Sequence, residues 1–516
     1  MEGTIWAFLP AVVAIVLALL TKQVYVSLFL GILVGALMYA GGNPLEALFT
    51  LYNVMSEKVG ANVPIIVFLA VLGILVVLMQ KSGGAMAYGE WAGKKIKSKS
   101  GALAATAGLG CLIFVDDYFN CLTVGSVMRP VTDKFKIARS KLAYIIDATA
   151  APICIIAPIS SWAAAVTGEL EGDGLMVFIS TIPFNVYALL TIVMVFALCY
   201  FKFDFGKMKR NDDLAEATGD VFAGEHEDGE ENAEIKANKN GKVRHLLIPV
   251  IILIACCIGG MIYTGFFYNW DTGLIDSELQ SANVIEAFAN CEAGTSLAIG
   301  STVALFIIAI YYMIARVVSF KEITSSLTEG FKAMVPAILI LTFAWSISGI
   351  MGARGGYLDA QAFVENNLTN SSFPAFLFPA IFFVLAGAIA FSTGTSWGTF
   401  GVLVPIAVTI LGGSGTLAVM TVSATLGGAV FGDHISPISD TTILASAGAQ
   451  CSHVDHVKTQ LPYASIIAGI AALAYIVGGL CVGLGSVLSG LIMWAAALLL
   501  FVITIFVIKS VTKKAQ

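Results

Sequence analysis

Aspartates occur inside long apolar stretches of this sequence, where an ionised side chain is costly. They are Asp116, Asp117, Asp147, Asp433 and Asp440. A charged side chain inside a membrane costs about 2.5–3.5 kcal/mol on insertion scales, so an acid at such depth is commonly functional. Carboxylates there can bind either a cation or a proton. We therefore expect this set to form ion-binding sites, with snorkelling to the membrane surface as the structural alternative.

The segment Gly432–Thr442, GDHISPISDTT, is the most polar run inside any of the apolar stretches. Pro437 lacks a backbone donor and disrupts a helix, which leaves carbonyl oxygens available to an ion. Hard cations bind several oxygen ligands, and this run supplies them. The side chains that could bind sodium here are those of Asp433, Ser436, Ser439, Asp440 and Thr441.

A similar break is predicted at Ala157–Ser161, APISS, where Pro158 interrupts the helix. The polar tips of two further segments are expected to face the two breaks. The remaining residues that could bind sodium are Ser160 and Ser161 at this break, Asp116, Asp117 and Asn120 at one tip, and Thr393, Thr395 and Ser396 at the other. Hydroxyls in membrane helices often bond only to the backbone, so each serine or threonine has a purely structural alternative.

Proton coupling needs groups that exchange protons, and Asp433, His434 and Asp147 are the candidates. His434 adjoins Asp433, and an unperturbed histidine titrates at about pH 6.5, within the working range. A packed, hydrogen-bonded histidine is the alternative for His434. The motif HVDH at His453–His456 resembles a set of metal ligands, but we place it in a short cytoplasmic loop without a third cluster and expect no metal there.

Aromatic residues lie beside both polar regions and could line a site for an organic solute. Trp162 follows the first break, Trp397 lies in the second tip, and Tyr118 and Phe119 lie in the first tip. A bare ion needs no aromatic wall, whereas an organic solute does. Structural packing is the equally strong alternative for the two tryptophans.

Composition excludes a soluble globular enzyme. The chain has 516 residues, of which 58% are hydrophobic and 12% charged, and its mean hydropathy is +0.88. That is enough apolar sequence for a dozen or more membrane passes at about 20 residues each. There is no phosphate-binding loop of the type GxxxxGK(S/T), so any transport would be driven by gradients rather than by a nucleotide.

Two apolar segments, 101–128 and 374–411, do not fit single passes. At 1.5 Å per residue the first would be a helix of about 42 Å, too long for one crossing and too short for two. The second is split by the polar run Ser392–Thr399. We interpret both as re-entrant hairpins, the first entering from the cytoplasm and the second from outside. The predicted fold class is an all-α polytopic membrane protein with about 11 transmembrane helices plus two re-entrant hairpins.

Basic residues set the predicted orientation. All of the 28 Lys and Arg residues except Lys58 and Arg354 fall on one side under this topology, and the positive-inside rule makes that side the cytoplasm. The acidic loops 169–174 and 269–294 contain no Lys or Arg and would face outside. We expect a multi-pass protein of the cell membrane with its N-terminus outside and its C-terminus in the cytoplasm.

The chain is predicted to comprise two membrane halves, 1–201 and 246–516, joined by the polar stretch 202–245. We interpret that stretch as a solvated cytoplasmic linker without chemistry. FVDD precedes APISS in the first half as FSTG precedes SPISD in the second, at nearly equal spacing. An odd number of spans separates the two pairs, so the halves would form an inverted repeat, which is typical of secondary transporters.

The motifs FVDDYFNCLTVGSVMRPVTDKF, KLAYIIDATAAPICIIAPISSWAA, STGTSWGTFGVLVPIA and FGDHISPISDTTILASAGAQCSHVDHVKTQLPYA resemble the NhaC-type sodium/proton antiporter family of the ion transporter superfamily. The resemblance spans both halves of the chain. It implies inverted repeats with two hairpins whose tips meet broken helices, with substrate and cations between them. It does not fix the substrate, because the family is also expected to include carriers of organic acids and amino acids.

Two functions follow from these observations. The first is sodium/proton antiport, in which the same carboxylates bind either ion. The second is sodium- or proton-coupled transport of a small organic solute, such as an amino acid or organic acid. An intramembrane aspartyl protease would have no use for the hairpins and the repeat, and a passive channel would be lined by rings of residues. Expected partners are sodium ions, protons, an organic solute in the second case, and the lipid bilayer. We expect no nucleic acid and no cofactor beyond the coupling ions, and a homodimer is left open.

Overall fold

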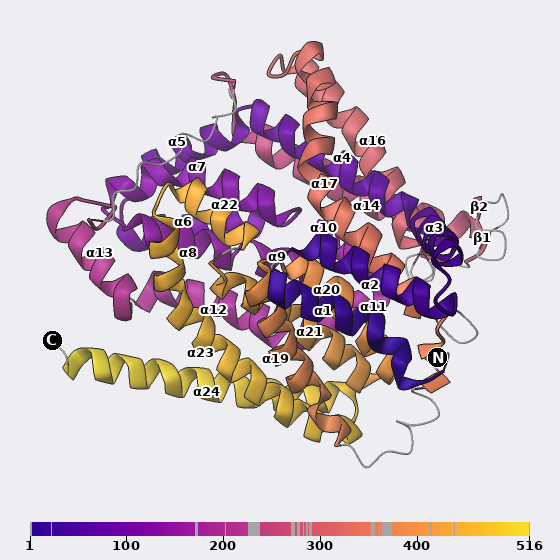
Figure 1. Cartoon of the computed structure of the whole chain (residues 1–516). Coiled ribbons are helices and arrows are strands. Elements are labelled where there is room, and N and C mark those ends of the chain that lie inside the picture. Colours follow the sequence, from indigo (N-terminus) through magenta and orange to yellow (C-terminus); the bar gives the residue numbers. More distant parts are fainter. Residues whose placement is uncertain are drawn as a thin grey trace.

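The computed structural model is a helical protein (Figure 1). It describes residues 3–21, 23–170, 174–201, 203–224, 238–269, 274–275, 279–281, 283–284, 287, 291–351, 357–360, 362–363, 374–412, 415–437 and 439–514. Three predicted site residues, Phe119, Thr393 and Asp440, have side chains outside the described part. Half of the loop 269–294 and residues 225–237 of the predicted linker also lie outside it.

The first half of the chain is built from helices that are mostly apolar. They are η1 (Ile5–Phe8), α1 (Leu9–Thr21), α2 (Val24–Tyr39), α3 (Pro44–Ala61), α4 (Val63–Lys81), α5 (Gly84–Lys95), α6 (Lys99–Leu112), α7 (Asp117–Lys134), α8 (Arg139–Ala148), α9 (Ala151–Cys154), α10 (Ser161–Thr167), α11 (Gly174–Thr181), η2 (Ile182–Phe184) and α12 (Val186–Phe201). The polar helix α13 (Gly206–Thr218) follows in the stretch 202–245.

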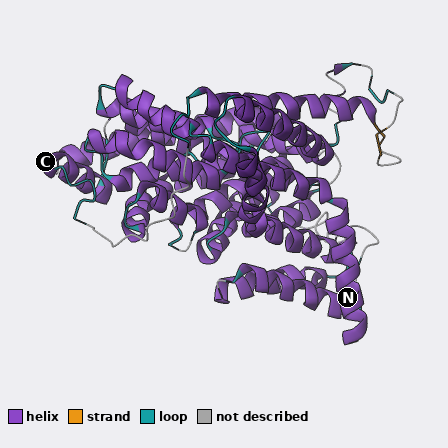
Figure 2. Cartoon of the chain, turned by 90° about the horizontal axis from the view of Figure 1, so that it is seen from above, coloured by secondary structure: helices purple, strands orange, loops and turns teal. Residues whose placement is uncertain are grey.

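The second half has the same character, with one short strand pair at an edge of the molecule (Figure 2). Its elements are α14 (Arg244–Phe267), β1 (Tyr268–Asn269), β2 (Leu274–Ile275), α16 (Ala293–Ile314), α17 (Phe320–Met351), η3 (Ala375–Leu377), α19 (Phe378–Thr393), α20 (Ser396–Leu411), α21 (Thr416–Ile435), α22 (Asp440–Ala449), α23 (His453–Leu480), η4 (Val482–Leu484) and α24 (Ser486–Lys514).

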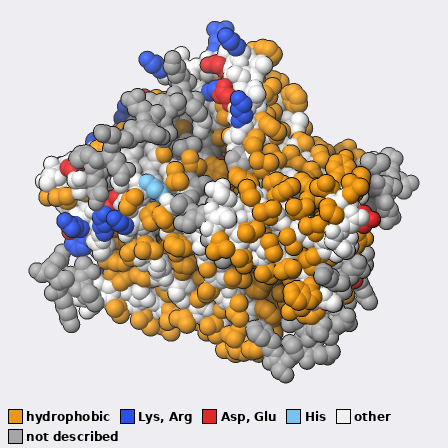
Figure 3. All heavy atoms as spheres, in the orientation of Figure 1, with side chains coloured by type: hydrophobic (Ala, Val, Ile, Leu, Met, Phe, Trp, Pro, Cys, Tyr) orange, Lys and Arg blue, Asp and Glu red, His pale blue; other side chains and the backbone are white. Residues whose placement is uncertain are grey.

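Eight helices of the described residues are long and apolar enough to cross a membrane, or nine if the two parts of α17, bent by 43°, count as one span. Four shorter apolar helices accompany them. Hydrophobic side chains cover most of the face seen in Figure 3, as expected for a surface in contact with lipid. The protein is therefore an all-helical polytopic membrane protein. The predicted division into 11 spans and two hairpins is more detailed than what helix length and composition show here.

The helices pack as two bundles that meet along a long interface. Helices α4, α14, α16 and α17 pack on one another with α1, α2 and α3, and we call this group the α17 bundle. Helices α6 to α10, α12 and α19 to α23 form the second group, the α21 bundle, in which α19 packs along α21. The bundles meet where α17 packs on α20 and where α10 packs on α4 and α16.

Both predicted helix breaks are present in the α21 bundle. At the first break the helical segment ends with α9. A new helix, α10, begins after Ser160, whose hydroxyl accepts a hydrogen bond from the backbone N–H of Ala163 at 3.0 Å. In the second break α21 ends at Ile435, and α22 begins after Ser439, whose hydroxyl accepts from the N–H of Thr442 at 3.1 Å. A proline within each break and a serine N-cap after it explain why the helix stops and restarts there.

Each polar tip is hydrogen-bonded to its own break. Between α6 and α7, the carbonyl of Val115 accepts from the N–H of Ser161 at 2.9 Å. At the end of α19, the carbonyl of Phe391 accepts from the Ser436 hydroxyl at 2.7 Å. The chain then turns at Gly394, whose φ of +71° suits glycine. These contacts bring the tips to the breaks as the sequence motifs predicted.

The polar stretch 202–245 contains a docked helix, α13 (Gly206–Thr218), in the part that the structure describes. The buried ammonium of Lys141 on α8 pairs with Asp204 at 2.6 Å and with Asp212 of α13 at 3.0 Å. Asp455 of α23 accepts from Asn211 at 2.7 Å. The interpretation of this stretch as a wholly solvated connector was therefore incomplete, because Met208, Asn211, Asp212 and Ala215 recur at helical spacing and give α13 one buried face.

Asn120 fixes the geometry of the first tip. Its side-chain amide donates to the carbonyls of Gly110 at 2.7 Å, Ile113 at 2.9 Å and Thr149 at 3.0 Å, so it joins α6, the tip and the end of α8. It acts as a donor to the backbone in this arrangement, a structural role that the sequence did not distinguish from sodium binding.

We predict that Asn120→Ala lowers the free energy of unfolding by about 1–3 kcal/mol, because buried carbonyls lose their donor. Ser180→Ala is the control, since its exposed hydroxyl bonds only to the carbonyl of Met176 one turn earlier in its own helix. The measurement is thermal or denaturant unfolding in detergent. Equal stability of the Asn120 variant and wild type would show that the tip is held by other contacts.

Candidate ion-binding site

Asp117 is fully buried at the start of α7, where the N-terminal end of the helix dipole favours a negative charge. The indole N–H of Trp162 donates to its Oδ2 at 3.0 Å. Trp162 belongs to α10, directly after the first break, so this hydrogen bond joins the tip to the restarted helix. Asp116 is 1% exposed and lies beside it in the tip. The structure therefore brings both tip aspartates to the first break.

An aromatic cluster of Trp162, Trp397 and Phe400 connects the first break to the second tip. The ring centroids of Trp162 and Trp397 lie 5.8 Å apart, and Phe400 lies 5.1 Å from Trp162 and 5.7 Å from Trp397. All three side chains are buried, and the N–H of Trp397 has no hydrogen-bond partner in the described part of the chain. The two indoles fill the space between the halves by packing on each other.

Asp433 is fully buried in the last turn of α21, at the second break. The hydroxyl of Thr441 donates to its Oδ2 at 2.7 Å, and Ser439 and Thr441 lie with their hydroxyl oxygens 3.3 Å apart. The break thus gathers a carboxylate and two hydroxyls, which are the ligand types expected for sodium. Ser436 is turned away, since its hydroxyl bonds to the carbonyl of Phe391.

Asp147 accepts hydrogen bonds from residues of the opposite half of the chain. Gln460 of α23 donates to its Oδ2 at 2.6 Å, and Thr442 of α22 donates to the same oxygen at 3.1 Å. The Nε2 atom of His456 lies 3.4 Å from it, and both side chains are fully buried. Asp147 therefore lies where α8, α22 and α23 meet.

Gln460 and His456 are site residues that the sequence analysis missed. The interpretation of HVDH as a loop was wrong, because α23 begins at His453 and one face of its first turns, which includes His456 and Gln460, is buried. His453 bonds to the carbonyl of Pro437 at 2.7 Å and to the Ser446 hydroxyl at 2.9 Å, which closes the second break. The four-residue spacing of His456 and Gln460 was the available signal, because it places both on one helix face.

The ring of His434 is bonded to Tyr187 rather than to its neighbour in the sequence. Its Nδ1 atom lies 2.9 Å from the hydroxyl of Tyr187 on α12, and its backbone carbonyl accepts from Gln460 at 2.7 Å. Both residues are buried. This geometry matches the packed, hydrogen-bonded alternative and links His434 to Asp147 through Gln460.

The serine and threonine candidates divide into two groups. Ser160 and Thr395 cap helices, and the Ser160 hydroxyl also donates to backbone carbonyls. The hydroxyls of Ser161 and Ser396 are buried and make no hydrogen bond within the described residues. Those two are therefore available to bind an ion. Tyr118 is partly buried at the first tip.

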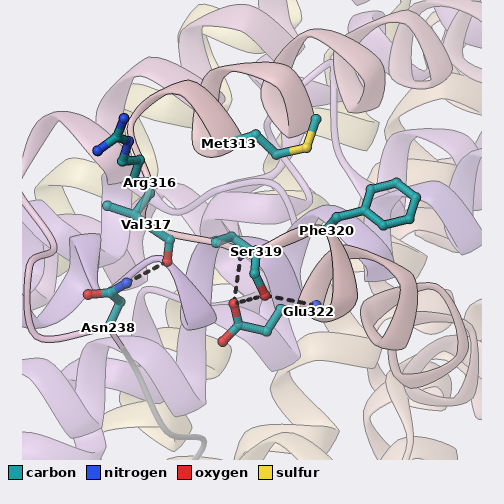
Figure 4. A pocket seen from close by; sticks show the side chains of 8 residues that line it. Asn238, Met313, Arg316, Val317, Ser319, Phe320 and Glu322 are labelled. Carbon is teal, nitrogen blue, oxygen red and sulfur yellow. Dashed lines mark hydrogen bonds between the residues drawn. The ribbon is translucent and has the colours of Figure 1, made fainter.

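A separate hollow of about 430 Å³ lies at the turn from α16 to α17 (Figure 4). Its polar groups bond to one another, as Asn238 donates to the carbonyl of Val317 at 2.8 Å and Glu322 accepts from the Ser319 hydroxyl at 2.6 Å. The lining residues are Asn238, Met313, Arg316, Val317, Val318, Ser319, Phe320 and Glu322. None of the predicted site residues lines it.

Buried carboxylates at helix breaks inside a polytopic helical bundle are the features of a secondary transporter. The model of the Na+/H+ antiporter family matches residues 164–480, and the chain belongs to that family. This confirms the NhaC-type resemblance of the sequence motifs, and it makes the protein a transporter and not an enzyme.

Relatives cover the chain to different extents. An uncharacterized protein of Haemophilus influenzae is 38% identical over 527 residues, which cover 98% of this chain and 96% of that protein. The Malate-2H(+)/Na(+)-lactate antiporter of Bacillus subtilis is 31% identical over 170 residues, which cover 32% of this chain and 34% of that protein. The solved YdaH transporter of Alcanivorax borkumensis covers 90% of this chain and 98% of its own, with a TM-score of 0.52 and 14% identity. This last likeness concerns the fold alone.

The two tryptophans provide a matched test of the bond to Asp117. Trp162→Phe and Trp397→Phe remove similar ring area, but only Trp162 has an N–H that donates to a carboxylate. Because a hydrogen bond to a charged group contributes about 1.5–3 kcal/mol, we predict that Trp162→Phe is the more destabilising by about that amount. Denaturant unfolding of both purified variants measures the difference. Equal losses would mean that the indole N–H adds nothing to the stability of the site.

Proposed function

We propose that this protein is a sodium/proton antiporter of the cell membrane. The observation that supports this most strongly is Asp433, a fully buried carboxylate at a helix break with two hydroxyls beside it. A carboxylate at such depth is costly as a bare ion and is stabilised by binding either a proton or a cation. Competition of the two ions for the same group is the simplest way to couple their opposite movements.

The proposed sodium ligands fall at the two breaks. Asp433, Ser439 and Thr441 form one set, together with carbonyls left open by the break; the tip aspartates with Ser161 form the other. The buried hydroxyls of Ser161 and Ser396, which make no hydrogen bond in the described part, support a role in binding. We assign the proton-coupling role to Asp433, Asp147 and His434. The contacts of Asp147 with Gln460 and His456 support its place in that set.

We further propose that the halves 1–201 and 246–516 form an inverted repeat with 11 spans and the hairpins 101–128 and 374–411. The order of elements supports the repeat, because the helix pair α6–α7 precedes the broken helix α8–α10 as α19–α20 precedes α21–α22. Alternating access would then follow from movement of the α21 bundle against the α17 bundle. Lys and Arg side chains gather toward the α13 side and the α16–α17 turn in Figure 3, which supports a cytoplasmic location for 202–245.

Coupled transport of a small organic solute is the second candidate. The relative in Bacillus subtilis supports it, because that protein is an antiporter of malate and lactate with protons and sodium as coupling ions. Trp162 and Trp397 would then line the solute site together with Tyr118 and Phe119. The close packing of the two indoles on each other is better explained by the first candidate, since a solute site needs space between the rings.

The central test uses purified protein in liposomes. We predict sodium-dependent proton flux for wild type, and a loss of more than about tenfold in Asp433→Asn and Asp117→Asn, since losing even about 1.4 kcal/mol of ion binding is tenfold in affinity. Asp213→Asn is the control, because this carboxylate is exposed and pairs with Lys209 on the surface. Flux that requires an added amino acid or organic acid would favour the second candidate. Unchanged flux in both site variants would contradict the assignment of the site.

The orientation has its own test. We predict that a cysteine placed at Leu279, an exposed residue of the loop 269–294, reacts with a membrane-impermeant maleimide in intact cells. A cysteine at the exposed Asn240 should react only after permeabilisation. The native cysteines give the background to subtract. The reverse pattern would invert the topology and the directions of both hairpins.

A further inference from the structure

Glu169 is a buried acid for which the proposed site has no role. It follows α10 by two residues and is 6% exposed, and neither carboxylate oxygen makes a hydrogen bond in the described part of the chain. The sequence analysis placed it in an outside loop, 169–174. Glu169 does lie in the turn after α10, but its side chain is buried, which the sequence did not indicate.

The surroundings of Glu169 belong to both bundles. On the α21 bundle side, a Cβ atom at Gly401 of α20 would lie 3.8 Å from Oε1 of Glu169. On the α17 bundle side, a Cβ atom at the preceding residue, Gly168, would lie 3.0 Å from the indole nitrogen of Trp345 and 2.9 Å from Ile65. Glu169 therefore lies where α10 and α20 meet α17 and α4.

No described charged group neutralises this carboxyl. Neither α11 nor α20 contains an ionisable residue. Lys58, at the end of α3, pairs with Glu57 at 3.5 Å, and Glu292, which caps α16, accepts from the N–H of Gly294 at 3.1 Å. In α4 and α17 the ionisable residues lie toward the helix ends opposite to Ile65 and Trp345, where Lys81 and Glu329 pair at 2.8 Å. The polar groups nearby are neutral: the indole of Trp345 and the carboxamide of Asn62, whose oxygen would lie 3.2 Å from a Cβ atom at Gly168.

An ionised carboxylate without a donor is strongly disfavoured in such an environment, whereas the neutral acid is tolerated. The conformation seen here therefore favours the protonated side chain. A relative movement of the two bundles would separate α20 from α17 and admit water to the carboxyl. The proton would then pass to water, leaving the carboxylate, and would return when the bundles close.

We propose that Glu169 is a proton-binding site between the two bundles, which takes up a proton in the conformation seen here and releases it when they move apart. The proposal rests on the proposed function, since it identifies a carrier of the coupled proton. Besides the aspartates at the breaks, the protein would have a carboxyl group whose protonation depends on the relative position of the two bundles. Sodium binding at the breaks does not require it.

Glu169→Gln tests this, because glutamine keeps the size and neutrality of the acid but cannot release a proton. In liposomes we expect sodium/sodium exchange within about twofold of wild type, since the aspartate sites are intact, and a loss of about tenfold or more in sodium flux driven by a pH gradient. Glu57→Gln is the control, because its side chain is 59% exposed. Full pH-driven flux in Glu169→Gln would overturn the proposal.

A second measurement does not depend on transport. The stability of wild type should fall as pH rises from about 5 to 8, because a buried neutral acid resists the ionisation that the unfolded chain permits. That slope should be smaller in Glu169→Gln and retained in Glu169→Asp. Identical slopes in wild type and Glu169→Gln would contradict the proposal. If wild type shows no sodium-dependent proton flux at all, the proposed function fails, while this slope still decides whether Glu169 binds a proton.

Discussion

The cost of placing a carboxylate inside a bilayer constrains the centre of this protein. Each aspartate must have a donor, and the donors come from other elements of the fold. Trp162 of α10 donates to Asp117 of α7, and Thr441 of α22 donates to Asp433 of α21. Asp147, in the first half of the chain, accepts a hydrogen bond from Gln460 in the second half. The hydrogen bonds that stabilise the buried carboxylates therefore also join the tips, the breaks and the two halves of the chain.

The helix breaks make these contacts possible. An unbroken helix would use its carbonyls internally and would present only side chains to an ion. A break exposes backbone oxygens and lets Ser160 and Ser439 start new helices beside the acids. The side-chain hydrogen bonds to these aspartates come from an indole, two hydroxyls and a carboxamide, which are neutral. Neutral donors stabilise a carboxylate without cancelling its charge, so the group can still attract a cation or a proton.

Sequence patterns predicted the features that depend on local chemistry. Composition indicated a helical membrane protein, and the prolines with their following serines located both breaks. The features that were missed depend on tertiary packing. His456 was assigned to a loop because the start of α23 is polar, and only the packing of α23 against α8 shows that His456 and Gln460 are buried. The burial of Glu169 within the turn after α10 likewise depends on packing and could not be read from the sequence. The number of spans could not be read from apolar runs alone, because several membrane helices here are shorter than a full crossing.

Binding of sodium to the purified protein as a function of pH tests the central claim most directly, namely that sodium and protons compete for the buried aspartates. Titration calorimetry gives the apparent dissociation constant without any need for transport. If the ions compete, that constant rises by up to about tenfold for each unit by which the pH is lowered across the titration of the site. A sodium affinity that does not change with pH would contradict the account, because the two ions would then bind to different groups.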